Sequence, residues 1–327
     1  MATLKDVAKL SGLNVSTVSR ILNGRGYISE IAKEKVESAM NELNYRPNAI
    51  ARNLAKSRSD LIALVVPHIN HPYFSMLIEN IERECYKNGF SLLVFNTKDD
   101  PKIEQKVLST CMAQRVSAMI LCSASFNLQS SLNTDIHTFT IERKIIGIPS
   151  IEVDNYAGGL MAAEHLISKG CKNLVFLGGN TSEDMPADKR GIGFVNYATE
   201  HGVKGSMHVC LSEDYLSLDY RNTIRKLLLE NKDCDGLFTS GDIIASQAIE
   251  VCHEMGIKVP DDIKIIGFDN QDICKITYPK LTTFAQPVKL IAKKALEFVN
   301  SYNEKKEVPD SVIFPIELIE RGSTKGV

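Results

Sequence analysis

The feature that most constrains this chain is a ten-residue stretch near its N-terminus, residues 14–23, which reads NVSTVSRILN. On a helix, its apolar residues fall at positions i, i+3 and i+4 and form one stripe: Val18, Ile21 and Leu22. The opposite side carries small hydroxyls, one cation and one amide: Ser16, Thr17, Arg20 and Asn23. A short helix with an apolar back and this polar front suits the DNA major groove, because a guanidinium can donate two hydrogen bonds to guanine.

The neighbouring segments predict the other helices of a small bundle. Residues 3–11 read as a first helix, because Thr3 and Asp6 have the spacing of a capping box. Residues 12–14 then form a tight connection of the helix-turn-helix kind. A third helix begins after Ser29, a good N-cap, and runs to about residue 44. Its inward-facing residues are Val36, Met40 and Leu43.

A short basic segment follows this bundle. Pro47 stops the third helix, and residues 49–56 predict a fourth helix capped by Asn48. A segment this short does not hold a helix alone in water, so we expect it to fold only when a partner holds it. Leu54 indicates DNA as that partner, because an apolar side chain can wedge between base steps in the minor groove.

These segments together resemble the lactose-repressor (LacI/GalR) family of bacterial transcription regulators. The resemblance rests on three motifs: TLKDVAKLSG from residue 3, STVSRILNG from residue 16 and LNYRPNAIARNLA from residue 43. It implies that the following residues contact the operator: Leu4, Val15, Ser16, Ser19, Arg20, Asn23 and Tyr27. It also implies hinge-helix contacts from Asn48, Ala51 and Leu54, with Leu54 as the intercalating wedge. Thr17 joins the DNA-binding set from the helix pattern, and we expect Val15 and Ser16 to discriminate between operators.

Charge is distributed unevenly along the 327 residues. Residues 1–59 contain ten Lys or Arg and five Asp or Glu, whereas the rest contains 28 and 35, so a head of +5 precedes a body of −7. This asymmetry fits DNA contact confined to one end. The chain has no apolar run near the roughly eighteen residues of a membrane helix and no signal-peptide pattern. We therefore expect a cytoplasmic protein whose eight dispersed cysteines are reduced thiols.

After residue 60, short apolar runs alternate with helical patterns. The first set comprises strands at 61–66, 90–95, 118–122, 138–141 and 151–153 and helices at 73–87 and 102–114. The second set comprises helices at 158–169, 188–201, 215–230 and 243–255 and strands at 173–177, 207–211, 236–239 and 263–268. A last helix at 288–302 crosses back. Such alternation predicts right-handed crossovers and doubly wound parallel sheets.

We therefore expect an α/β protein with an all-α helix-turn-helix headpiece at its N-terminus. The family resemblance implies a body of the periplasmic-binding-protein type I fold, with two doubly wound parallel-sheet subdomains. The expected boundaries are 1–46 for the headpiece, 47–60 for the hinge helix and linker, and 61–327 for the body. Within the body, the N-subdomain spans about 61–156 and 286–311, and the C-subdomain spans about 157–285 and 312–327.

Polar and aromatic residues follow the predicted strands, where ligands bind in such sheets. The expected effector site comprises Tyr73, Phe74, Glu142, Arg190, Asp242, Asp269 and Gln286. Carboxylates, a guanidinium, an amide and aromatic faces together suit a polyhydroxylated small molecule. The resemblance places Phe74, Glu142, Arg190, Asp269 and Gln286 at effector-binding positions. Family members usually have Asn-Asp where this chain has Gly241 and Asp242, so one expected amide contact is missing.

Other motifs indicate no catalysis. His68 and His71 have no third metal ligand at a sensible spacing, and they read as loop histidines. Gly191 and Gly193 lack the third glycine of a dinucleotide fingerprint. The chain also lacks a P-loop and a Gly-x-Ser-x-Gly motif. We therefore expect no metal, no cofactor and no enzyme activity.

The sequence predicts a repressor of a carbohydrate-utilisation operon that binds a near-palindromic double-stranded operator as a homodimer, away from membranes. A small-molecule effector in the cleft between the subdomains would shift the repressor between two states, by induction or by co-repression. The motifs RGYISE, VDNYAGG and KIIGFD resemble Gram-positive sucrose-operon repressors, which implies a sucrose-type sugar or a sugar phosphate. Two alternatives stay open: a regulator gated by a partner protein, and a sugar- or nucleoside-binding protein without a DNA role.

Overall fold

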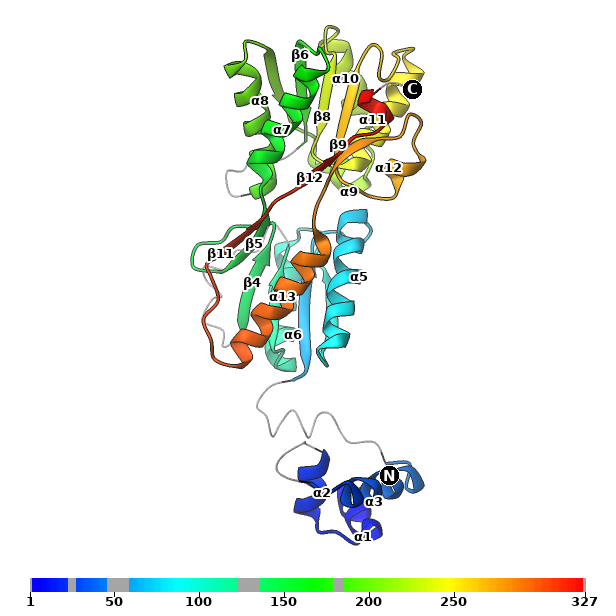
Figure 1. Ribbon diagram of the computed structural model, residues 1–327, viewed down its shortest axis with the longest axis vertical. Coiled ribbons are helices and arrows are strands. Elements are labelled where there is room, and N and C mark those ends of the chain that lie inside the picture. Colours follow the sequence, from blue (N-terminus) through cyan, green and yellow to red (C-terminus); the bar gives the residue numbers. More distant parts are fainter. Residues whose placement is uncertain (1, 23–27, 46–58, 123–135, 179–184, 326–327) are drawn as a thin grey trace. The chain divides into compact units, whose positions relative to one another are not determined.

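The computed structural model describes residues 2–22, 28–45, 59–122, 136–178 and 185–325. They belong to two compact units, Met1–Asp60 and Leu61–Val327, which we name the headpiece and the body (Figure 1). No helix in the described ranges is both long and apolar enough to cross a lipid bilayer.

The described part of the headpiece forms three helices, α1 (Leu4–Ser11), α2 (Val15–Leu22) and α3 (Glu30–Glu42). Asp6 Oδ2 accepts hydrogen bonds from the backbone N and the hydroxyl of Thr3, both at 2.8 Å, which confirms the predicted reach of Asp6 back to the start of α1. Gly12 has a φ of +69°, a conformation that a side chain disfavours and that turns the chain sharply towards α2. The helices meet on a small core of Val7, Ala8, Val18, Val36 and Ala39.

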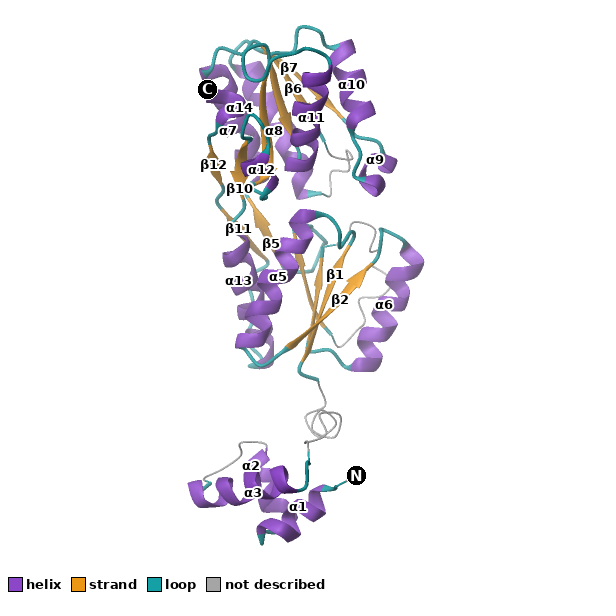
Figure 2. Cartoon of the chain, turned by 90° about the vertical axis from the view of Figure 1, so that its right-hand side faces the viewer, coloured by secondary structure: helices purple, strands orange, loops and turns teal. Residues whose placement is uncertain are grey.

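The N-subdomain of the body is built on a parallel sheet of order β11-β5-β4-β3-β1-β2. Its strands are β1 (Leu61–Val66), β2 (Ser91–Asn96), β3 (Ala118–Leu121), β4 (His137–Ile141), β5 (Ser150–Val153) and β11 (Ser311–Phe314). Its helices are α5 (Pro72–Lys87), α6 (Pro101–Gln114) and α13 (Val288–Asn303). The helices α5 and α13 cover one face of the sheet, and α6 covers the other (Figure 2).

The buried strand β1 shows how the sequence produces these layers. Its alternate residues Ile62 and Leu64 pack into the core shared with α5 and α13, whereas Ala63 and Val65 pack against α6. Successive side chains on a strand point to opposite faces, so a strand covered on both faces reads as a continuous apolar run. The six-residue run at 61–66 therefore predicted this strand correctly.

The C-subdomain has a second sheet, of order β12-β10-β9-β8-β6-β7. Its strands are β6 (Asn173–Leu177), β7 (Lys204–His208), β8 (Gly236–Thr239), β9 (Lys264–Asp269), β10 (Thr282–Ala285) and β12 (Glu317–Ile319). Its helices are α7 (Asn155–Ser168), α8 (Lys189–Glu200), α9 (Ser212–Ser217), α10 (Arg221–Glu230), α11 (Asp242–Glu254), α12 (Ile273–Ile276) and α14 (Gly322–Lys325), with a 3₁₀ turn at Pro186–Asp188. All the strands pair in parallel except β12, which is antiparallel to β10.

Three short crossings connect the two subdomains. They lie between β5 and α7 at Asp154, between β10 and α13 at Gln286 and Pro287, and between β11 and β12 at residues 315–316 (Figure 1). Because β11 pairs with β5 up to Phe314, the N-subdomain extends three residues beyond the expected boundary at 311. The predicted boundary at 156 likewise falls just inside α7, which packs against α8 of the C-subdomain.

Two predicted elements of the C-subdomain were wrong. The strand expected at 207–211 lies at Lys204–His208, because β7 is an edge strand and the apolar run that suggested 207–211 is largely exposed. The single helix expected at 215–230 is broken into α9 and α10 at Leu218, which has a φ of +55°. The side chain of Gln247, on α11, stabilises this break. Its Nε2 donates a hydrogen bond to Leu218 O at 2.8 Å, and its Oε1 accepts one from Tyr220 N at 2.7 Å.

Candidate functional site

The predicted DNA-reading helix α2 begins at Asn14, whose Oδ1 accepts hydrogen bonds from Thr17 N and the Ser16 hydroxyl, both at 2.7 Å. Val18 is fully buried at the back of the helix, whereas Arg20 is exposed on the other side. The predicted contact residues divide by exposure: Val15, Ser16 and Arg20 are exposed, and Leu4, Thr17 and Ser19 are half-buried. Five further predicted contacts lie outside the described residues: Asn23, Tyr27, Asn48, Ala51 and Leu54.

In the body, the residue that follows β4 joins the two subdomains. Glu142 has a φ of +54°, and its Oε1 accepts a hydrogen bond from Val153 N at 2.6 Å. Its Oε2 accepts from Asn155 Nδ2 at 2.9 Å and lies 3.9 Å from Arg190 Nη2. Burial raises the pKa of Glu142, and the positive charge of Arg190 opposes that shift. Glu142 therefore lies against the first crossing between the subdomains.

Arg190, in the first turn of α8, occupies the centre of this cluster. Its Nε donates to Asn155 Oδ1 and its Nη1 to Ser240 O, both at 2.7 Å. Its guanidinium carbon lies 3.5 Å from the centre of the Phe268 ring, within cation–π distance. The residue is only 5% exposed. One buried cation thus connects α7, α8, β8 and β9.

Glycines on α7 and α8 allow this arrangement. A Cβ on Gly159 would lie 2.0 Å from Arg190 O, and a Cβ on Gly193 would lie 2.4 Å from Tyr156 O. Both obstacles are backbone atoms of the facing helix, so only glycine permits such close packing. The glycine at 193, which did not fit a dinucleotide fingerprint, is explained by this contact between helices.

Asp269 ends β9 and accepts two amide hydrogen bonds. Gln286 Nε2 donates to its Oδ1 at 2.7 Å, and Gln271 Nε2 donates to its Oδ2 at 3.0 Å. Burial, and secondarily the nearby charge of Asp242, raises the pKa of Asp269 to about 8, against the opposing effect of Arg190. Asp269 is therefore joined to Gln286, the residue at the second crossing between the subdomains.

Asp242 lies behind this cluster. Its Oδ1 accepts from the Thr283 hydroxyl at 2.5 Å, and its Oδ2 accepts from Gln271 N at 2.8 Å. The residue is fully buried, and burial raises its pKa to about 6. With both oxygens bonded inside the C-subdomain, Asp242 holds the turn after β9 in place. Its charge acts on Asp269, and a direct contact between Asp242 and an effector stays a prediction.

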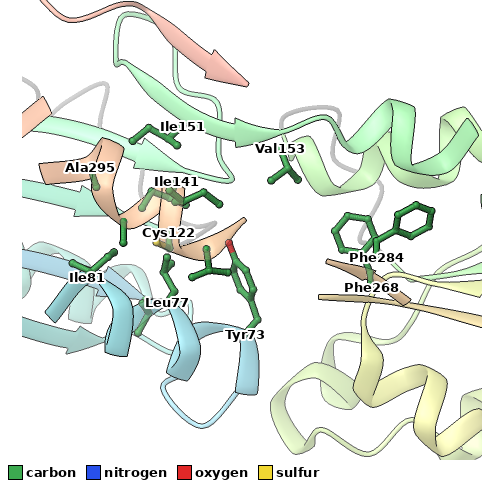
Figure 3. Packing of buried hydrophobic residues seen from close by; sticks show 14 of the residues in the cluster. Tyr73, Leu77, Ile81, Cys122, Ile141, Ile151, Val153, Phe268, Phe284 and Ala295 are labelled. Atoms are coloured by element: carbon green, nitrogen blue, oxygen red, sulfur yellow. The ribbon is translucent and has the colours of Figure 1, made fainter. Parts of the chain in front are cut away.

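Two aromatic residues complete the site from the N-subdomain. Tyr73, near the start of α5, belongs to the same buried cluster as Phe268 and Phe284 of the C-subdomain (Figure 3). Its pKa is raised well above the ordinary value, first by burial and then by the charge of Glu142. Phe74 is half-buried and packs edge-on against Tyr73, with ring centres 5.3 Å apart.

Three buried polar atoms of this cluster have no hydrogen-bond partner within the described residues: the Tyr73 hydroxyl, Gln271 Oε1 and Gln286 Oε1. All three side chains are less than 9% exposed. Leaving a buried polar group unbonded costs roughly 1–3 kcal/mol, so each such group needs an explanation, and a bound molecule is one. The predicted residues Tyr73, Glu142, Arg190, Asp269 and Gln286 thus lie in one buried polar cluster, and that an effector binds there stays a prediction.

The sequence reasoning missed Asn155, Gln271 and Phe268. Asn155 and Gln271 follow strands, so the same strand-end rule points to them, whereas Phe268 lies one residue inside the end of β9. Among the described residues, no group of three His, Cys, Asp or Glu is placed to hold a metal ion. His71 has a structural function, because its Nδ1 accepts from Tyr73 N at 3.3 Å at the start of α5. Burial lowers its pKa to about 4.

The raised pKa of Asp269 predicts how stability depends on pH. In the unfolded chain this carboxyl ionises near 3.8, whereas in the folded body it stays protonated to about pH 8. Its contribution is therefore fully present at low pH and is lost as pH rises from about 4 to about 8. Urea unfolding across this range should show a stability that decreases with pH, and Asp269→Asn should flatten the slope. An unchanged slope in this variant would contradict the assignment, and Asp233→Asn, on an exposed loop, is the control.

A helix-turn-helix unit joined to a two-subdomain body, with a buried polar site at the crossings, defines a class of DNA-binding regulators. Family models agree: residues 3–48 match bacterial regulatory proteins of the lacI family, and residues 163–324 match a periplasmic binding protein-like domain. The sucrose operon repressor of Streptococcus mutans serotype c is 32% identical over 320 residues, 98% of each chain. The chain therefore belongs to the LacI family, and it is a DNA-binding transcription regulator.

Solved structures show the same fold. The lac repressor dimer bound to operator and the anti-inducer ONPF superposes with a TM-score of 0.86, at 24% identity over 99% of both chains. A periplasmic binding protein/LacI transcriptional regulator from Alkaliphilus metalliredigens, complexed with D-xylulofuranose, superposes with a TM-score of 0.71 at 29% identity. That match covers 81% of this chain and 99% of the other. The expected periplasmic-binding-protein-like body of two parallel-sheet subdomains is confirmed.

Proposed function

We propose that this protein represses a carbohydrate-utilisation operon and is controlled by a small molecule that binds among Glu142, Arg190, Asp269 and Gln286. The observation that carries the proposal is the set of buried, unpartnered polar atoms beside these residues. Hydroxyl groups both donate and accept hydrogen bonds, so a sugar can satisfy carboxylates, amides and a phenol together. The Tyr73 and Phe74 rings would supply the apolar surface of such a site.

The relatives support a sugar as the effector class. The similar protein of Streptococcus mutans is named a sucrose operon repressor, and the similar structure from Alkaliphilus metalliredigens holds D-xylulofuranose. These two names involve different sugars, so the choice of sugar depends on residues in which the chains differ. A sucrose-type sugar is our first candidate for this chain.

The positions of the site residues suggest how binding is transmitted. Asn155 directly follows the first crossing between the subdomains, and Gln286 lies in the second. A ligand that draws these residues together therefore favours one angle between the subdomains over another. Whether the effector induces or co-represses depends on which arrangement it binds more tightly, because a ligand shifts an equilibrium only by its differential affinity.

At the operator, we propose that two headpieces of a homodimer read the half-sites of a near-palindromic sequence. Arg20→Ala should weaken specific binding by about 1–3 kcal/mol and relax the preference at one base position. The physical reason is the loss of an exposed guanidinium on the face of α2 opposite the buried Val18. Fluorescence anisotropy with operator and random DNA measures both effects. Equal losses on the two DNAs would show that Arg20 contacts only phosphates.

The effector site is tested by Asp269→Ala. This variant should lose the effector response, because Asp269 connects β9 to the crossing residue Gln286, while operator affinity without effector stays unchanged. Operator binding with increasing sugar measures the response, and Asp233→Ala on an exposed loop is the matched control. A normal response of Asp269→Ala would show that the effector binds elsewhere.

A further inference from the structure

We infer that the effector is an uncharged polyhydroxylated molecule and that this site rejects phosphorylated sugars. The inference rests on the proposed function and specifies the chemical class of its ligand. It removes one of the two effector types that the sequence left open, because a sugar phosphate carries roughly one and a half to two negative charges near neutral pH.

The charge of the site disfavours a phosphate. Three acidic side chains lie in or directly behind it: Glu142, Asp242 and Asp269. A fourth, Glu152, is buried near Glu142 and contributes to raising its pKa. Two cations act on these carboxyls: Arg190, which is hydrogen-bonded among them, and Arg321, which donates to Leu281 O and Asn270 Oδ1 and whose charge opposes the rise in the pKa of Asp242. Because Asp269 stays protonated to about pH 8, the acidic groups that a phosphate would meet near neutral pH are Glu142, Asp242 and Glu152.

The guanidinium of Arg190 already has protein partners. Two of its nitrogens donate to Asn155 and Ser240, a third lies 3.9 Å from Glu142, and its face covers Phe268. Arginine usually binds phosphate through two parallel hydrogen bonds from its free edge. Here that edge is directed at carboxylate, carbonyl and amide oxygens, so capture of a phosphate would require breaking these bonds.

The site has hydrogen-bond acceptors that lack a donor. The unpartnered amide oxygens of Gln271 and Gln286 are both buried, and each of these side chains donates its NH₂ group to Asp269. Acceptors require a ligand that donates, and sugar hydroxyls do so, whereas a fully ionised phosphate only accepts.

Arg143 follows Glu142 directly, and it is the cation that would bind the phosphate if the effector were a phosphorylated sugar. It is therefore part of the test.

Isothermal titration of the full-length protein with matched pairs tests the inference: fructose and fructose 6-phosphate, glucose and glucose 6-phosphate, sucrose and sucrose 6-phosphate. The parent sugar should bind at least about tenfold more tightly than its phosphate, because like charges in a buried site repel. Glu142→Gln should reduce this ratio, and Asp233→Asn on an exposed loop should leave it unchanged.

Two other results are decisive in different ways. If a phosphorylated member binds more tightly and Arg143→Ala removes that preference, the inference is overturned while small-molecule control stands. If no member of any pair binds, while operator DNA still does, the proposed small-molecule control fails and this inference fails with it.

Discussion

Arg190→Met is expected to lower the free energy of unfolding of the body by about 3–5 kcal/mol, the range for breaking a buried ion pair from one side. Methionine retains the apolar stem but leaves Glu142 without its cation and Asn155 and Ser240 without their donor. Urea unfolding followed by circular dichroism measures the loss. The same variant should not respond to sugar, because the connection between α7, α8 and β9 is removed.

The matched control is Arg221→Met. Arg221 pairs with Asp219 on the surface of the same subdomain, and both side chains are nearly half exposed. An exposed ion pair contributes little, so the unfolding midpoint should hardly move. Equal stability losses for the two variants would show that burial does not increase the contribution of Arg190 to the free energy of unfolding.

Gly159→Ala is expected to destabilise the body by about 1–3 kcal/mol or more, as overpacking against a rigid neighbour does. In an ordinary helix the same change is favourable by about 1 kcal/mol, so the expected sign is reversed here. The new Cβ would lie 2.0 Å from Arg190 O, and backbone must move to admit it. That movement would separate Arg190 from Asn155, so sugar affinity should fall as well. Thermal unfolding and sugar titration measure the two effects.

The neighbouring Gly158 provides the control for this prediction. A Cβ there would meet Ile316 Cδ1 at 2.6 Å, which is the free end of a flexible side chain. Gly158→Ala should therefore cost less stability than Gly159→Ala, and Asn155 and Arg190 should keep their contact. A larger loss for Gly158→Ala would contradict the role given to the close approach of α7 and α8.

Buried strands were predicted best, and the strand at the edge of the second sheet was predicted worst. The run at 61–66 gave β1 correctly, because a strand covered on both faces needs apolar residues throughout. β7 at the sheet edge needs no such run, and its position was misjudged by three residues. The break at Leu218 could not be predicted from the local sequence, because it is stabilised by Gln247 on α11, which is distant in the chain.

The candidate site was predictable to the extent that chain order determines it. Glu142, Asp269 and Gln286 follow strands, and parallel strands bring their carboxyl ends to one edge. Contacts across the chain determine the rest. Asn155 bonds to both Glu142 and Arg190, and nothing in its local sequence reveals those partners. Asp242 likewise accepts hydrogen bonds from Thr283 and Gln271, and its local sequence does not reveal these partners.

The most direct test of the central claim is operator binding measured by fluorescence anisotropy, with and without sugars. The DNA comes from the upstream region of the protein's own gene, and the panel contains neutral sugars. We predict that one sugar changes operator affinity by about tenfold, which corresponds to about 1.4 kcal/mol of coupling between the body and the headpiece. Tight operator binding that no sugar changes would contradict the account and would point to a partner protein as the signal.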